Sequence, residues 1–165
     1  MMNAANVTST ELPATVATTR TYRFSLRMME QCFTEINLIL RTTPSNATIY
    51  PGLLSFLVAF KAFNPAAYDL LGGSLSYPRI KELLTEIAKD LDLSDSDIVW
   101  MLAQFTAYLL YGYLEQEEKI KDAVLELTTD EQGKAYAPQL IQIMSHVESD
   151  HHVVKDLVAM LNLAV

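Results

Sequence analysis

The sequence predicts an all-α fold, with about seven helices in one compact domain at residues 22–165, after a disordered arm at residues 1–21. Apolar residues recur at steps of three and four, which is typical of helices that bury one face. No segment alternates apolar and polar residues as a strand does, and no period of about 20–50 residues repeats. The arm is rich in Thr, Ala and Asn and has no periodic apolar pattern, so we expect it to be disordered.

The first expected helix spans residues 26–41, and Ser25 is a suitable N-cap for it. Steps of three and four predict a buried face made of Leu26, Met29, Phe33, Ile36 and Leu40. The polar face carries Arg27, Glu30, Gln31, Thr34 and Arg41. A helix at residues 50–63 follows, and its apolar character on nearly every side predicts a central position.

Four more helical segments are expected after residue 63. They are a short helix at 64–71, a helix at 78–91, a long helix from about 95 to 127 with a break near Gly112, and a restart at 138–150. A last helix is expected at residues 152–165.

The run at residues 98–114 contains no charged residue. It is at the short limit for crossing a bilayer, and no Lys or Arg lies close to either end, so we favour a buried helix over a membrane span. Its aromatic side chains either fill the core, which we favour, or line a ligand pocket. They are Trp100, Phe105, Tyr108, Tyr111 and Tyr113.

The composition and the absence of known motifs argue against several classes of function. The formal net charge of −8 argues against binding to nucleic-acid phosphates. The single cysteine, Cys32, fits a reducing compartment, and the N-terminal segment lacks the features of a secretory signal, so a cytoplasmic protein is expected. There is no phosphate-binding loop, no zinc signature and no hydrolase elbow, which predicts a protein that is not an enzyme and needs no cofactor.

Two clusters of polar residues have competing interpretations. His146, Asp150, His151 and His152, with Glu148, either form a weak metal site or lie in a solvated turn between helices, which we favour. In EQEEKIKD, residues 115–122, the spacing predicts ion pairs from Glu115 to Lys119 and from Glu117 to Lys121. Such pairs are typical of an exposed helix face.

Arg27 stands in the first turn of its helix, where a cation opposes the positive end of the helix dipole. An anion bound there would be attracted by the guanidinium and by the free amides of the helix start. By itself, an arginine on this turn is also compatible with an ordinary surface.

Residues 22–75 resemble the helical lid that follows the nucleotide-binding core in KAP-family P-loop NTPases. The residues that carry the resemblance are Ser25, Arg27, Glu30, Leu53, Leu54, Leu57, Lys61, Phe63, Pro65 and Tyr68. The resemblance implies that Arg27 contacts nucleotide phosphate, with residues 76–165 as a helical extension. The chain lacks the Walker-containing core, so that contact would need a core supplied elsewhere.

We therefore expect a non-catalytic helical domain that acts through protein–protein contact. Its partner would be a P-loop ATPase core in trans, a core in a longer chain of which these residues are a fragment, or another protein. The alternative is a helical bundle that binds a small ligand or a metal. The sequence predicts neither the partner nor the oligomeric state.

Overall fold

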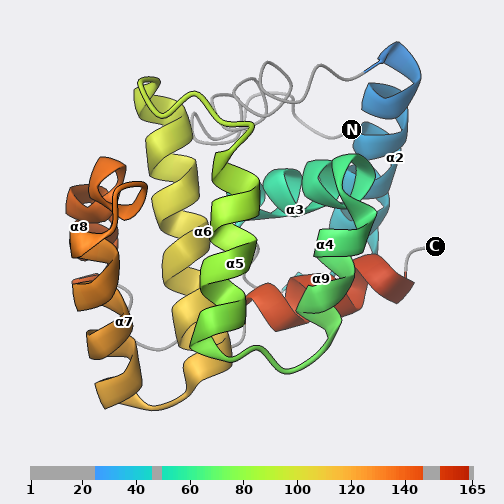
Figure 1. Cartoon of the computed structure of the whole chain (residues 1–165). Coiled ribbons are helices and arrows are strands. Elements are labelled where there is room, and N and C mark those ends of the chain that lie inside the picture. The colour runs from blue at the N-terminus through green and yellow to red at the C-terminus, as the bar shows by residue number, and fades with distance from the viewer. Residues whose placement is uncertain (1–24, 46–49, 147–152, 164–165) are drawn as a thin grey trace.

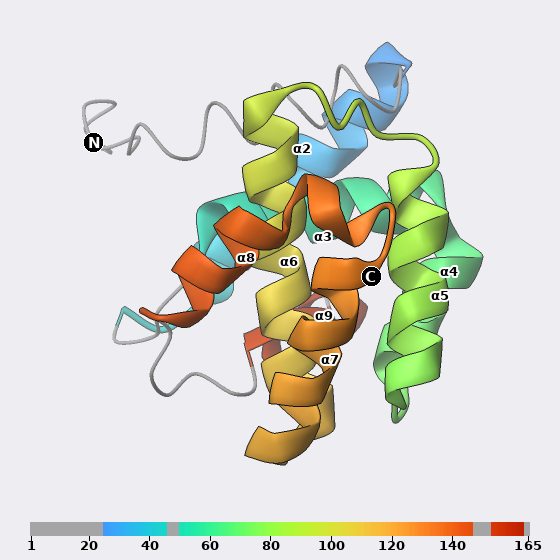
Figure 2. The same ribbon diagram turned by 60° about the vertical axis from the view of Figure 1, so that its left-hand side comes forward.

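The computed structural model describes residues 25–45, 50–146 and 153–163. Within these ranges it contains α-helices, two 3-10 turns and no strand, so the predicted all-α fold is confirmed. Figures 1 and 2 show the helices from two directions. In chain order the elements are α2 (Leu26–Thr42), α3 (Pro51–Phe63), α4 (Pro65–Asp69), η2 (Leu70–Gly72), α5 (Tyr77–Ala88), α6 (Ser96–Leu114), α7 (Glu117–Thr129), η3 (Gly133–Ala135), α8 (Ala137–Met144) and α9 (Val153–Leu163).

Helix α6 is the central element of the fold (Figure 1). Fourteen of its 19 residues are buried, so neighbours cover all of the helix except a strip that includes Asp97, Trp100 and Gln104. That cover comes from α3, α5, α7, α8 and α9, all of which pack against it. No helix within the described ranges combines the length and apolar character that a membrane span requires.

The aromatic residues of α6 mostly fill the core, as expected. The ring of Phe105 packs against Phe56, with 4.6 Å between the centroids, and against Phe60 at 6.4 Å. The Tyr113 hydroxyl donates to the Leu71 carbonyl at 2.6 Å, and burial raises the pKa of Tyr113 to about 12. Trp100 is the exception among these aromatic residues, because 40% of its surface is exposed.

The break after α6 lies at Glu115 and not at Gly112. Gly112 is helical and buried, whereas Glu115 adopts a left-handed conformation with φ of 57°. A residue in this conformation commonly ends a helix, although glycine usually fills the position. The chain therefore turns three residues later than predicted, and α7 begins at Glu117.

The predicted buried face of α2 was wrong in part. Ile36 packs half-buried against the core and Met29 is half-buried, but the fully buried residues are Cys32 and Ile39, and Leu26, Phe33 and Leu40 are exposed. Helix α2 has apolar residues on more than one side, so periodicity alone did not identify the side that packs against α3 and α9. The Ser25 cap is confirmed, since its side chain accepts a hydrogen bond from the Met28 amide.

One lysine ties α2 to the rest of the domain. Lys61 Nζ on α3 lies 2.6 Å from Glu35 Oε1 on α2 and donates to the Leu161 carbonyl of α9 at 3.0 Å. Both charged side chains are 22% exposed. The same ammonium lies 5.9 Å from the centre of the Tyr68 ring on α4. Four helices thus meet at one partly buried cation.

We expect Lys61→Met to lower the free energy of unfolding by about 1–3 kcal/mol, because Glu35 would remain partly buried without its cation. Lys121→Met is the matched control, since it removes a pair with Glu117 that is largely exposed. Its effect should be much smaller. Urea denaturation of the three proteins measures both values, and equal losses would contradict a special role for Lys61.

Candidate functional site

Arg27 is exposed in the first turn of α2, as the sequence predicts. It lines a shallow depression between α2 and α3 together with Glu30, Glu35 and Lys61. Lys61 is already engaged by Glu35. A phosphate beside Arg27 would therefore face two carboxylates and a cation that is committed to another partner, which makes this depression a poor anion site.

The structure describes only the first residue of the histidine cluster. His146 is exposed just after α8, and Glu148, Asp150, His151 and His152 lie outside the described residues. Among the residues that the structure does describe, no three His, Cys, Asp or Glu side chains come together as metal ligands. The predicted metal site thus stays a prediction.

The ion pairs predicted at residues 115–122 are confirmed in part. Lys121 pairs with Glu117 at 3.0 Å, one helical turn away on α7. Glu115 precedes α7 and lies 3.7 Å from Lys155 on α9, so its predicted i, i+4 pair with Lys119 was wrong. The position of the break is the reason, because Glu115 lies in it and not on α7, the helix that carries Lys119.

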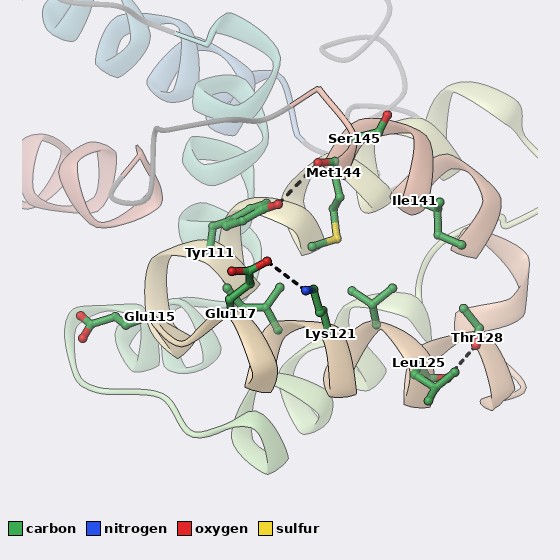
Figure 3. A pocket seen from close by; sticks show the side chains of 11 residues that line it. Tyr111, Glu115, Glu117, Lys121, Leu125, Thr128, Ile141, Met144 and Ser145 are labelled. Atoms are coloured by element: carbon green, nitrogen blue, oxygen red, sulfur yellow. Dashed lines mark hydrogen bonds and ion pairs between the residues drawn. The ribbon is translucent and has the colours of Figure 1, made fainter.

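A groove between α7 and α8 is a surface feature that the sequence did not predict (Figure 3). Its volume is about 830 Å³. Its lining combines apolar side chains of α7 and α8 with Tyr111 of α6 and charged residues near the start of α7. The lining residues are Tyr111, Glu115, Glu117, Ile120, Lys121, Val124, Leu125, Thr128, Ile141, Met144 and Ser145.

The two helices that form the groove are both anchored on α6. Helix α7 buries Ile120, Ala123 and Leu127, and α8 buries Ala137 and Leu140. These inward residues leave other apolar side chains on the outer surface. Leu125 is 67% exposed and Ile141 is 52% exposed, and they form the two apolar lips of the groove.

The charged residues of the groove lie toward one end. Figure 3 shows Tyr111, Glu115, Glu117 and Met144 at this end, with Leu125 and Thr128 at the other. The Tyr111 hydroxyl donates to the Met144 carbonyl at 3.4 Å. Glu117 pairs with Lys121 and Glu115 pairs with Lys155, and the C-termini of α6 and α8 lie near the N-terminus of α7, so charges of both signs meet at this end.

Part of this site could be predicted from the sequence. The sequence raised the possibility that aromatic residues of 98–114 line a pocket, and Tyr111 does line the groove. Leu125 and Ile141 are the residues that could have indicated the groove, because each is apolar and lies outside the buried stripe of its helix. Their meaning depends on α7 lying beside α8, which periodicity within one helix does not reveal.

No family model, curated protein or solved structure matches the chain. The resemblance to KAP-family NTPases therefore stays a prediction from the sequence pattern of residues 22–75.

Gly133 sets the corner between α7 and α8. Its amide donates to Asp130 Oδ2 at 3.2 Å, and a Cβ atom at this position would collide with the Leu127 carbonyl of α7. We expect Gly133→Ala to lower the free energy of unfolding by about 1–3 kcal/mol, as overpacking does. In Gly73→Ala, the control, the added atom would lie 3.9 Å from its nearest neighbour, the Leu70 carbonyl. Thermal and urea unfolding should leave the control close to wild type, and similar losses for the two variants would contradict this role.

Proposed function

We propose that this chain is a non-catalytic protein-interaction domain whose α7–α8 groove receives an amphipathic helix of another polypeptide. The observation that carries the proposal is the pair of apolar lips, Leu125 and Ile141, above an apolar floor that includes Ile120, Val124 and Met144. Helix-in-groove recognition uses such a surface, with apolar side chains of the incoming helix as anchors.

The exposure of the lips favours a helix over a small molecule. A volume of about 830 Å³ would suit a small ligand. Small-ligand sites, however, enclose most of the ligand's surface. Here Leu125 and Ile141 are more than half exposed, so they leave a trough that is open to solvent. An elongated occupant would cover both lips at once.

The resemblance to KAP-family NTPases would make a P-loop ATPase core one such polypeptide, with Arg27 as its phosphate contact. Arg27 is exposed, which that role requires. Glu30 and Glu35 share its depression, and they disfavour a phosphate there. The groove therefore supports protein contact better than Arg27 supports nucleotide contact.

Site-specific photo-crosslinking in the native cells tests the proposal. We expect benzoylphenylalanine in place of Leu125 to give a covalent adduct with a polypeptide, because an occupant of the groove would lie against this lip. The matched control carries the same residue in place of Leu70, which is 43% exposed and does not line the groove. Mass spectrometry of the adduct then identifies what was captured.

An adduct at position 125 that is absent at position 70 supports a protein-binding groove, whichever protein is found. No adduct at position 125, or equal labelling at both positions, contradicts it.

A further inference from the structure

A second apolar surface runs along α2. Leu26, Met29, Phe33, Ile36 and Leu40 follow one another at alternating steps of three and four residues. This spacing is that of the a and d positions of a heptad repeat, which line the contact between two paired helices. We call these five side chains the α2 seam.

The domain covers only part of the α2 seam. Met29 and Ile36 are half-buried, and Ile36 packs against the core. Leu26, Phe33 and Leu40 are 70%, 50% and 38% exposed, respectively. Helix α2 packs against α3 and α9 through a neighbouring side. The open part of the seam can therefore receive another helix without any change in the fold.

The charges of α2 favour contact between copies of the chain. The chain has a net charge of −8, whereas α2 carries two arginines and two glutamates and has no net charge. Arg27, Glu30 and Arg41 are exposed, and none of them makes an ion pair with a residue in the described ranges. Two copies of an acidic protein repel each other over most of their surfaces, and α2 is a neutral surface at which they can approach.

We propose that α2 pairs with α2 of a second copy through the α2 seam, in an antiparallel, twofold arrangement. This inference goes beyond the proposed function, because it leaves the α7–α8 groove free. The assembly closes at two copies, since each copy uses the same surface. An isolated peptide of two heptads would have to fold in order to pair. Here the helix is already formed and held by its domain, which removes most of that cost.

The exposure pattern of the seam favours the antiparallel direction. In an antiparallel pair, Met29 of one copy meets Leu40 of the other, and Phe33 meets Ile36. Every contact then joins an exposed side chain to a half-buried one, so the side chains that protrude fill the space above those that do not. A parallel pair would join like positions and would leave the half-buried residues apart.

Glu30 and Arg41 favour the same direction. In the antiparallel pair, position 30 of one copy is level with position 39 of the other, two residues from its Arg41. At a rise of about 1.5 Å per residue, the separation along the axis is about 3 Å. Two symmetric pairs between Glu30 and Arg41 of different copies then form. In a parallel pair the same residues would be about 16 Å apart, and Glu30 would face Glu30.

The contact is small. Standard protein interfaces bury about 1,600 Å² in total, and contacts well below this area are weak and transient. The part of the seam that is open on each copy consists of three side chains. We therefore expect a reversible dimer that forms only as the protein concentration rises.

Sedimentation velocity of the full chain, from about one to several hundred micromolar, tests the pairing. Wild type should change from monomer to dimer. Phe33→Glu should raise the dissociation constant at least about tenfold, because it places a charge in the centre of the seam. Leu125→Glu, the matched control, makes the same change at an exposed position outside α2 and should dimerise like wild type. Circular dichroism checks the fold, and Phe33→Ser replaces Phe33→Glu if that variant proves unfolded.

A charge exchange tests the antiparallel direction. Glu30→Arg and Arg41→Glu, each alone, place like charges opposite each other in both symmetric pairs. Each should raise the dissociation constant about three- to tenfold at low ionic strength. An equimolar mixture of the two variants should recover the wild-type value, because both pairs in the mixed dimer join opposite charges.

Four results would overturn the proposal. They are a wild type that stays monomeric at every concentration, a dimer that survives Phe33→Glu, an equal loss in Leu125→Glu, and a mixture of the charge variants that dimerises no better than either alone. Crosslinking at position 125 is independent of these results, because no residue of α2 lines the groove.

Discussion

The burial of most of α6 is the constraint on which the rest of the structure depends. A helix with 14 buried residues out of 19 leaves only a narrow strip for water, along Asp97, Trp100 and Gln104, so several neighbours must cover the rest. Helix α7 does so because the chain reverses at Glu115, and α8 does so after the corner at Gly133. Both helices turn their apolar stripes toward α6. The trough between them is what remains when two helices cover the same neighbour side by side.

Helix α2 is held differently. It packs against α3 and α9. The ion pair between Lys61 and Glu35 fixes its rotation, because it brings a carboxylate to the inner side of the helix. The side that carries Leu26, Phe33 and Leu40 consequently faces outward. The α7–α8 groove and the exposed apolar side of α2 thus have separate structural origins.

Sequence periodicity predicted the helices well and their partners poorly. The uncharged run at residues 98–114 identified α6 as a buried helix, and Ser25 identified the start of α2. The inward face of α2 was missed because it includes Glu35, whose partner Lys61 lies 26 residues away in the sequence. The end of α6 was placed at Gly112, since glycine is the usual terminator, whereas Glu115 takes the left-handed position. The groove was missed because Leu125 and Ile141 acquire a role only when α7 and α8 lie together.

Amide hydrogen exchange of the full chain tests the central claim most directly, because it reports which helix opens last. The account predicts the slowest exchange in α6, with faster exchange in α2. Exchange in α6 that is as fast as in α2 would contradict the claim that the fold depends on the burial of α6.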